Sequence, residues 1–297
     1  MSDEGTDVAL VTGGTGVIGG AVARKLAERG DRVLLVGRDA DRGSSLAAEL
    51  RDGTPGDAAF LRVDLADRAA VRELAATVRE EGRLDRFVAA AGTFREARET
   101  TPDGIEYTLA VNYLSTYLLC HELVPLALET APGDGGDAAM GAGPDPVRVV
   151  ALTAAVSDRQ IDLDDLQSAT DYELQVAYAR SKRCLTSFAV ELADRLPDGV
   201  AVDALHPGFV PEGRSREQLP WFVRGPYRVL SALSVGDGAD TAADRVVEVA
   251  TGGSGATGRY IEGGERADVP AFAADEAARG ELWRRSAELV DVDPDWP

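Results

Sequence analysis

Apolar and polar positions alternate between two periods along most of the chain. Short runs of apolar, β-branched residues predict strands at residues 8–12, 32–36, 59–63, 86–90, 148–153, 200–205 and 259–261. Apolar residues that recur every three or four positions predict helices at residues 17–29, 67–80, 107–131, 177–195, 241–251 and 275–290. Strands that alternate with helices of this length predict an α/β fold, with a doubly wound parallel sheet and helices on both faces.

The alternation continues over the whole chain, so we expect one catalytic domain over residues 1–297. Residues 133–146 are rich in Gly, Asp and Pro without periodicity, which predicts a flexible surface loop. Residues 212–235 carry scattered large apolar side chains, which are expected either to form a substrate lid, to pack within a helix pair or to contact another subunit. Residues 275–290 are expected to form a C-terminal helix that packs through Leu282, Trp283, Leu289 and Val290.

A glycine-rich turn follows the first predicted strand and opens directly into a helix. Glycines at such a place allow a tight turn and let backbone N–H groups approach a pyrophosphate at the positive end of the helix. The position straight after the first strand of an alternating pattern favours a dinucleotide site over a ligand-free turn. The residues expected to bind the cofactor here are Gly13, Thr15, Gly16, Val17, Ile18 and Gly19.

The second strand ends with Gly37, Arg38 and Asp39. An acid at the strand end would bind the ribose 2′-hydroxyl of NAD, but Gly37 leaves that place empty. Arg38 offers a planar cation suited to a 2′-phosphate, so we expect NADP(H) in preference to NAD(H). Asp39 would instead favour NAD(H) if its carboxylate neutralises Arg38 or reaches the ribose. Asp64 and Leu65, after the third strand, are expected to border the adenine.

Tyr178 and Lys182 are four residues apart and therefore share one face of a predicted helix. A tyrosine is a poor acid–base catalyst at neutral pH unless a nearby ammonium and a bound nicotinamide together lower its pKa. Such a pair also occurs by chance on helix surfaces. Lys182, however, is one of only two lysines in a chain that otherwise uses arginine. We therefore interpret Tyr178 and Lys182 as catalytic residues.

The glycine turn, this Tyr-x-x-x-Lys pair and His206-Pro207-Gly208 after the sixth strand together resemble the short-chain dehydrogenase/reductase family over nearly the whole chain. Its fold is Rossmann-like. The stretch 164–167 and the C-terminal helix are similar to the branch of retinol dehydrogenases and protochlorophyllide reductases. The resemblance implies that Tyr178 is the acid/base and that Lys182 binds the nicotinamide ribose and tunes the tyrosine. It further implies that Asn112 holds a water of the proton relay, with a locally satisfied helix residue as the alternative. The cofactor is then bordered by Ala91, Gly92, Pro207 and Gly208.

Three positions depart from the family pattern. The family serine that binds the substrate carbonyl falls on Ala154 when counted from the strand, and on Thr153 when counted back from residues 165–167. Thr153 retains a hydroxyl, whereas Ala154 would cost about 10²–10³ in rate. The Asn-Asn-Ala-Gly run appears as Ala-Ala-Ala-Gly at residues 89–92, and the threonine that follows Pro-Gly is replaced in the region 211–213.

The chain is strongly acidic, with 31 Lys and Arg against 51 Asp and Glu, a formal net charge of −20 and two isolated cysteines. Such a surface repels nucleic acid and anionic lipid, so neither is an expected partner. Two origins could explain this composition: a halophile with a salt-rich cytoplasm, or an organism with a GC-rich genome. The size of the negative excess favours the halophile. We expect a cytoplasmic protein without a signal peptide, a membrane span or a metal site.

The favoured interpretation is an NADP(H)-dependent oxidoreductase that transfers hydride between nicotinamide and an apolar carbonyl or alcohol substrate. The alternative is an NADPH-binding regulatory or interaction module with little turnover, which the three altered positions favour. A third alternative is an enzyme of the same family that reduces a carbon–carbon double bond. A homo-oligomer is a further expectation, with Leu114, Leu118, Leu185 and Phe188 either in the subunit contact or in the core.

Overall fold

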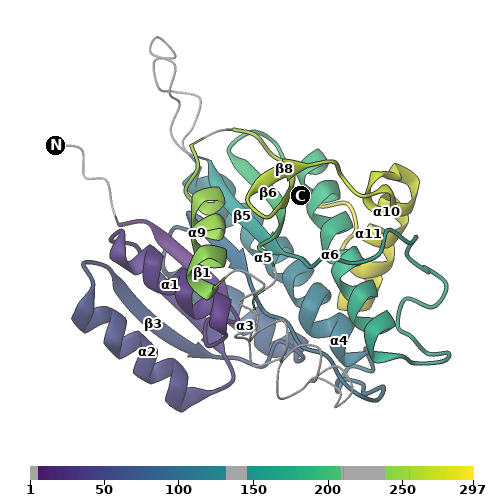
Figure 1. Ribbon diagram of the computed structural model, residues 1–297, viewed down its shortest axis with the longest axis horizontal. Helices are drawn as coiled ribbons and strands as arrows, with labels where there is room; N and C mark the ends of the chain where they lie inside the picture. Colours follow the sequence, from purple (N-terminus) through teal and green to yellow (C-terminus); the bar gives the residue numbers. More distant parts are fainter. Residues whose placement is uncertain (1–5, 132–145, 209, 211–237, 254) are drawn as a thin grey trace, which may run out of the picture.

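The computed structural model describes residues 6–131, 146–208, 210, 238–253 and 255–297. The chain forms one α/β domain around an eight-stranded sheet with the order β3-β2-β1-β4-β5-β6-β7-β8 (Figure 1). Among the described strands, pairing is parallel from β3 through β7, and β8 runs antiparallel at the edge beside β7. The strands are β1 (Val8–Thr12), β2 (Arg32–Gly37), β3 (Asp57–Arg62), β4 (Arg86–Ala89), β5 (Val147–Leu152), β6 (Val200–His206), β7 (Tyr260–Glu262) and β8 (Glu265–Ala267).

The central strands are covered on both faces, which explains their continuous apolar runs. Every residue of β1 and of β5 is buried. One face of the sheet carries α1 (Val17–Glu28), α2 (Ala40–Gly53) and α9 (Ala239–Ala250), whose apolar sides join a single buried cluster. The other face carries α3 (Arg68–Glu80), α5 (Ser115–Thr130) and α6 (Leu174–Arg195), which share the second buried cluster. The sheet thus separates two cores.

From β1 the chain first adds β2 and β3 on one side and then crosses over to add β4, β5 and β6 on the other side. The strand order therefore reverses at β1. In open α/β sheets, ligands bind outside the carboxyl ends of the strands at such a reversal. Because the strands from β1 to β6 are parallel, the residues that follow each of them meet along one edge. The fold therefore brings the predicted cofactor and catalytic residues to one side of the molecule.

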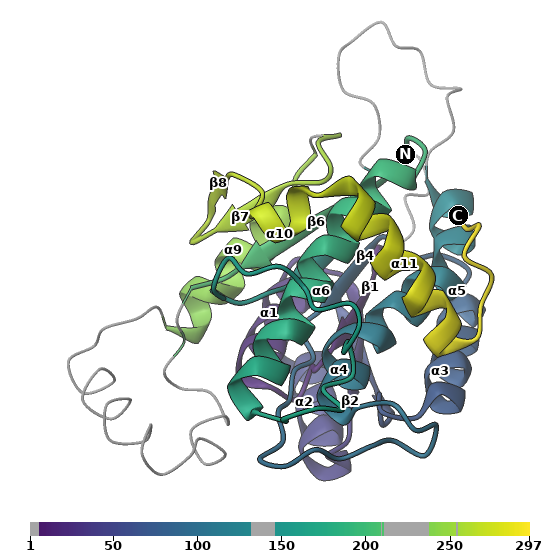
Figure 2. The same cartoon turned by 90° about the vertical axis from the view of Figure 1, so that its right-hand side faces the viewer.

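A C-terminal layer covers the outer side of α5 and α6. It consists of α10 (Ala271–Ala274), α11 (Glu276–Val290) and the end of the chain (Figure 2). The Trp283 ring stacks on Phe188 of α6 at 5.7 Å between centroids, and Trp296 donates its indole N–H to the Tyr117 hydroxyl of α5 at 3.0 Å. Leu282, Trp283 and Val290 are fully buried and Leu289 packs against the same core. The helix thus packs through the expected side chains.

This layer decides the role of the four side chains that the sequence left between the core and a subunit contact. Leu114, Leu118, Leu185 and Phe188 have at most 2% of their surface exposed within the single chain. They belong to the core beneath α11, and they supply no surface for a second subunit.

Most of the predicted elements are found within a few residues of their expected bounds. The sequence pattern missed α2, the short α10 and the antiparallel β8. The long helix expected at 107–131 is interrupted: α4 (Tyr107–Leu109) leads into the π-helical segment η1 (Ala110–Leu114) before α5 begins. The loop expected at 133–146 lies outside the described residues except for its last residue, and the lid expected at 212–235 lies wholly outside them.

Candidate active site

The glycine turn after β1 leaves the first amides of α1 without partners inside the helix. Gly16 is the N-cap and contributes no side-chain hydrogen bond. The first helical bond runs from Gly20 N to Gly16 O at 2.9 Å, so the N–H groups of Val17, Ile18 and Gly19 precede it. Backbone donors at the positive end of a helix are suited to an anionic group such as a pyrophosphate.

The glycines of this turn are required by close packing as well as by conformation. Gly13 has a φ of +67°, and a Cβ there would lie 2.8 Å from Ala90 O and from the backbone of Ala91. A Cβ on Gly19 would lie 2.3 Å from Gly13 O. The turn is therefore pressed against the segment after β4 on one side and against the start of α1 on the other. The narrow cradle, lined by backbone, fits a dinucleotide.

The end of β2 is crowded by Thr15. A Cβ on Gly37 would lie 2.8 Å from Thr15 Oγ1, so a side chain at this position would have to displace Thr15. The neighbouring Asp39 is the N-cap of α2, where its carboxylate accepts a hydrogen bond from Arg42 N at 3.1 Å. Arg38 is exposed, and its Nη1 donates to the Tyr107 hydroxyl at 2.9 Å.

The two residues expected to border the adenine lie after β3. Asp64 turns its carboxylate back to the chain, where Oδ1 accepts from Ala66 N at 3.1 Å. Leu65 is buried and belongs to the core cluster beneath the edge. The two residues thus shape the edge beside β2, with Leu65 contributing an apolar wall.

Asn112 lies in η1, and its side chain is fully buried in a hydrogen-bonded network. Its Oδ1 accepts from Thr93 N at 2.7 Å, while Nδ2 donates to Thr93 O and to Ser181 Oγ, both at 2.9 Å. Ser181 Oγ in turn donates to Tyr178 O at 2.7 Å. Segments of π-helix are frequent at functional sites, and this one links the segment after β4 to the helix that carries Tyr178 and Lys182.

Lys182 reaches from α6 to the carboxyl end of β5. Its buried Nζ donates to Leu152 O at 2.8 Å and lies 3.8 Å from the place that a Cβ on Gly92 would take. Burial lowers the pKa of the Lys182 ammonium to about 8. The structure therefore brings Lys182, Gly92 and the end of β5 together.

Tyr178 is half-buried one turn before Lys182, and its ring meets Phe94 edge-on with 6.1 Å between centroids. The sequence predicts a lowered pKa for this phenol when Lys182 and a bound nicotinamide act together. In the chain alone, burial raises the pKa of Tyr178, and the Lys182 ammonium is directed to Leu152 O. The phenol is therefore protonated at neutral pH.

Thr153 and Ala154 differ in the groups that they present after β5. Thr153 continues the sheet beyond β5, because its N–H donates to Leu205 O at 2.8 Å. Its Oγ1 is buried and has no hydrogen-bond partner within the described segments. A buried hydroxyl without a partner is costly and favours a role with a ligand, whereas Ala154 is half-buried and has no polar group to offer.

Pro207 and Gly208 follow β6 at the same edge of the sheet. Gly208 has a φ of +102°, which accounts for a glycine there. Pro207 O accepts from Arg245 Nη1 of α9 at 2.7 Å. The region 211–213, where the family threonine would lie, is outside the described residues.

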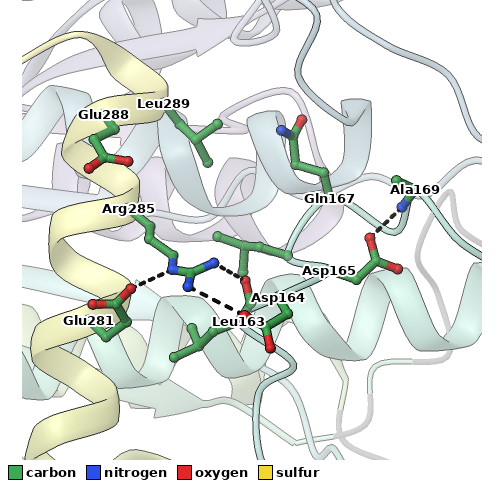
Figure 3. A pocket seen from close by; sticks show the side chains of 10 residues that line it. Leu163, Asp164, Asp165, Gln167, Ala169, Glu281, Arg285, Glu288 and Leu289 are labelled. Carbon is green, nitrogen blue, oxygen red and sulfur yellow. Dashed lines mark hydrogen bonds and ion pairs between the residues drawn. The ribbon is translucent and has the colours of Figure 1, made fainter.

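A surface pocket of about 500 Å³ lies elsewhere, between residues 163–169 and α11 (Figure 3). Arg285 of α11 joins the two sides by donating to Leu163 O at 2.6 Å, and it also donates to Glu281 Oε1 of its own helix at 2.6 Å. None of the residues expected to bind cofactor or to act in catalysis lines this pocket. The stretch 164–167 therefore borders the C-terminal layer.

Several residues of the site have no signal in the sequence. Thr93, Ser181 and Tyr107 belong to the hydrogen-bonded network or to the end of β2 only through contacts that span 19 to 69 residues. The interruption of a predicted helix by η1 is equally silent, because its apolar pattern is that of an ordinary buried helix.

Comparison with known proteins places this geometry in a family. The profile of the short chain dehydrogenases matches residues 7–135. Retinol dehydrogenase 12 of Bos taurus is 31% identical over 293 residues, covering 96% of this chain and 86% of its own length. The chain belongs to the short-chain dehydrogenases. It is an alcohol or carbonyl oxidoreductase of that family, related to the retinol dehydrogenases.

The chain is also similar to a second dehydrogenase and to a solved structure. Polyprenol dehydrogenase of Mus musculus is 34% identical over 291 residues, covering 95% of this chain and 83% of its own length. The RhlG/NADP active-site complex of Pseudomonas aeruginosa is 27% identical with a TM-score of 0.63, covering 90% of this chain and 96% of that one. In this short-chain dehydrogenase, no helix of the described segments has the length and apolar character needed to cross a bilayer.

Proposed function

We propose that this short-chain dehydrogenase uses NADP(H) to transfer hydride between nicotinamide and an apolar carbonyl or alcohol substrate, with Tyr178 as the acid/base. The observation that carries the proposal is the position of Lys182. Its buried ammonium lies beside Gly92 and the end of β5, one helical turn from the Tyr178 phenol. A dinucleotide bound along the glycine turn supplies the hydride for reduction of the carbonyl carbon.

Tyr178 donates its hydroxyl proton to the carbonyl oxygen as that oxygen gains charge. Burial raises the pKa of the phenol, so the hydroxyl carries its proton at neutral pH and is ready for the reductive direction. Loss of the proton leaves a phenolate, which the positive charge of Lys182 stabilises. The pKa of Lys182, near 8, keeps that ammonium mostly charged at neutral pH.

Thr153 and Asn112 support this proton transfer. Thr153 Oγ1, which has no partner in the described structure, donates a hydrogen bond to the substrate oxygen. Asn112 holds η1, Thr93 and Ser181 in place, and through them the backbone of Tyr178. Both Nδ2 protons of Asn112 are already donated. A relay water bound by Asn112 would therefore have to donate a hydrogen bond to its Oδ1 or to its backbone oxygen.

The preference for NADP(H) rests on the end of β2. Gly37 carries no acid to meet a ribose 2′-hydroxyl, Thr15 crowds that position, and Asp39 is engaged at the N-terminus of α2. Arg38 is exposed there and offers its guanidinium to a 2′-phosphate. The similarity to a structure solved with NADP supports the same choice.

The apolar nature of the substrate is supported by two relatives whose names refer to retinol and polyprenol. Both are long apolar alcohols. A formal net charge of −20 further suggests a protein that works in a salt-rich cytoplasm, where counterions screen its self-repulsion.

The test is oxidation of NADPH and of NADH with a panel of apolar aldehydes and ketones, in dilute buffer and in molar KCl. The proposal predicts alcohol products, identified by mass, and a higher kcat/KM with NADPH than with NADH. A panel that yields saturated products from carbon–carbon double bonds, or no turnover despite tight NADPH binding, would contradict it.

A further inference from the structure

Arg38 and Tyr107 connect two elements on either side of β1. Arg38 follows β2 and Tyr107 begins α4, which comes after β4, and β1 lies between these two strands. The 2.9 Å hydrogen bond from Arg38 Nη1 to the Tyr107 hydroxyl joins them across the edge where the glycine turn emerges from β1. The bond uses one N–H group of the guanidinium and leaves the others to a ligand.

Tyr107 is itself held from two sides. The Arg95 guanidinium lies 3.8 Å from the centroid of the Tyr107 ring, which is cation–π distance. Arg95 Nη1 also donates to Thr93 Oγ1 at 3.0 Å. On the helix side, the buried Glu106 caps α4 by accepting from Thr108 N at 2.8 Å and Leu109 N at 2.7 Å. The Tyr107 hydroxyl is therefore a fixed acceptor on a short, capped helix.

The charges around this tyrosine favour an anion beside Arg38. Arg95 is paired with Glu99 at 3.1 Å. Among the described residues, no carboxylate forms an ion pair with Arg38, and the nearest acid in sequence, Asp39, accepts from Arg42 N. The Arg38 guanidinium is exposed, so an incoming anion can reach it.

We propose that Tyr107 is a positioning residue that determines cofactor specificity, because it holds Arg38 in place for the 2′-phosphate of an adenosine ribose. This inference rests on the proposed use of NADP(H). A free arginine side chain must lose rotamer freedom when it binds a phosphate, and prior anchoring removes part of that cost. The anchor acts on the phosphomonoester alone and does not affect the rest of the nucleotide.

The test compares two small probes that differ in the 2′-phosphate. Binding of 2′,5′-ADP and of 5′-AMP to the full chain is measured by calorimetry, for wild type, Arg38→Leu, Tyr107→Phe and the double variant. Tyr107→Phe keeps the ring on Arg95 and removes only the hydroxyl. Tyr172→Phe is the matched control, since its hydroxyl donates to Arg95 O at 3.0 Å and makes no hydrogen bond to Arg38 in the described structure.

We expect wild type to bind 2′,5′-ADP more tightly than 5′-AMP, and Arg38→Leu to abolish the difference. Tyr107→Phe weakens 2′,5′-ADP about five-fold, leaves 5′-AMP unchanged and has no further effect in the Arg38→Leu background. Tyr172→Phe matches wild type with both probes. Unchanged 5′-AMP binding reports that the nucleotide site is intact.

Two results overturn the inference, and they are distinguishable. If Arg38→Leu loses the 2′-phosphate preference while Tyr107→Phe binds 2′,5′-ADP as well as wild type or better, Arg38 acts without the tyrosine. If wild type itself shows no preference for 2′,5′-ADP, the proposed use of NADP(H) is wrong and the role of Tyr107 falls with it.

Discussion

The side-chain amide of Asn112 forms hydrogen bonds with both the N–H and the C=O of Thr93. The Asn112 side chain accepts from Thr93 N at 2.7 Å and donates to Thr93 O at 2.9 Å, and both residues are buried. These two hydrogen bonds tie η1 to the segment that carries Gly92, and a third, to Ser181 Oγ, ties it to α6. The same side-chain amide thus positions both parts of the proposed site.

Replacement of Asn112 by alanine is expected to lower the free energy of unfolding by about 2–3 kcal/mol. The change leaves the buried N–H and C=O of Thr93 without their partners, which is costlier than the loss of an exposed hydrogen bond. Urea denaturation measures the effect. Ser181→Ala removes one partner of the same network and should cost only about 1 kcal/mol; equal losses in the two variants would contradict the central place of Asn112.

Gly19→Ala and Gly280→Ala form a matched pair of substitutions inside helices. In α1, the new Cβ would lie 2.3 Å from Gly13 O, so we expect a displaced turn and a loss of at least about ten-fold in dinucleotide affinity. In α11, nothing lies within 4 Å of the new Cβ, and the better helix propensity should raise stability by about 0.5–1 kcal/mol. Dinucleotide titration and thermal unfolding measure both. Normal dinucleotide binding by Gly19→Ala would be inconsistent with the cradle.

Lys182 makes stability depend on pH in a defined direction. Burial lowers its pKa from 10.5 to about 8, so the unfolded chain holds this proton more tightly than the folded chain. Stability relative to Lys182→Met should therefore rise by about 2 kcal/mol between about pH 7 and about pH 10. Urea denaturation of both proteins at each pH gives this difference.

Lys25 is the control for that measurement. The pKa of Lys25 is raised, chiefly by a hydrogen bond with Asp244. The stability that Lys25 contributes is therefore lost only as the pH rises above the ordinary lysine range. Lys25→Met should show no such change over the same interval. A wild-type stability that stays constant relative to Lys182→Met would mean that the ammonium is not buried.

Thr153 is predicted to be the hydroxyl that binds the substrate oxygen. Thr153→Ala should lower kcat by about 10²–10³, whereas Thr153→Ser should stay within a few-fold of wild type. Steady-state kinetics with the best substrate of the panel measures both. Ala154→Ser placed in the Thr153→Ala background tests the other count of the strand: recovery of kcat there would show that residue 154 holds the position.

The fold could be predicted from the sequence because period and turn chemistry agree along most of the chain. The strand at Val8–Thr12 and the turn at Gly13 are local signals, and they appear at the expected residues. The helix α2 was missed because Gly43 and several polar residues interrupt its short apolar stripe. Here packing on the sheet overrides weak local propensity.

The candidate site could be predicted only where its residues lie in local motifs. Tyr178 and Lys182 stand out by spacing, but the partner of Lys182 is the carbonyl of Leu152, 30 residues away. The choice between Thr153 and Ala154 depends on where β5 ends, which is set by pairing with Leu205 on β6. Such contacts between distant segments have no counterpart in periodicity.

The most direct test of the account is turnover of NADPH with an apolar aldehyde or ketone by Tyr178→Phe, measured beside NADPH binding by the same variant. Phenylalanine keeps the ring against Phe94 and removes the proton that the substrate oxygen requires. The account predicts near wild-type binding of NADPH and a loss of about 10²–10⁴ in kcat. A variant that reduces the substrate as fast as wild type would contradict the role of Tyr178.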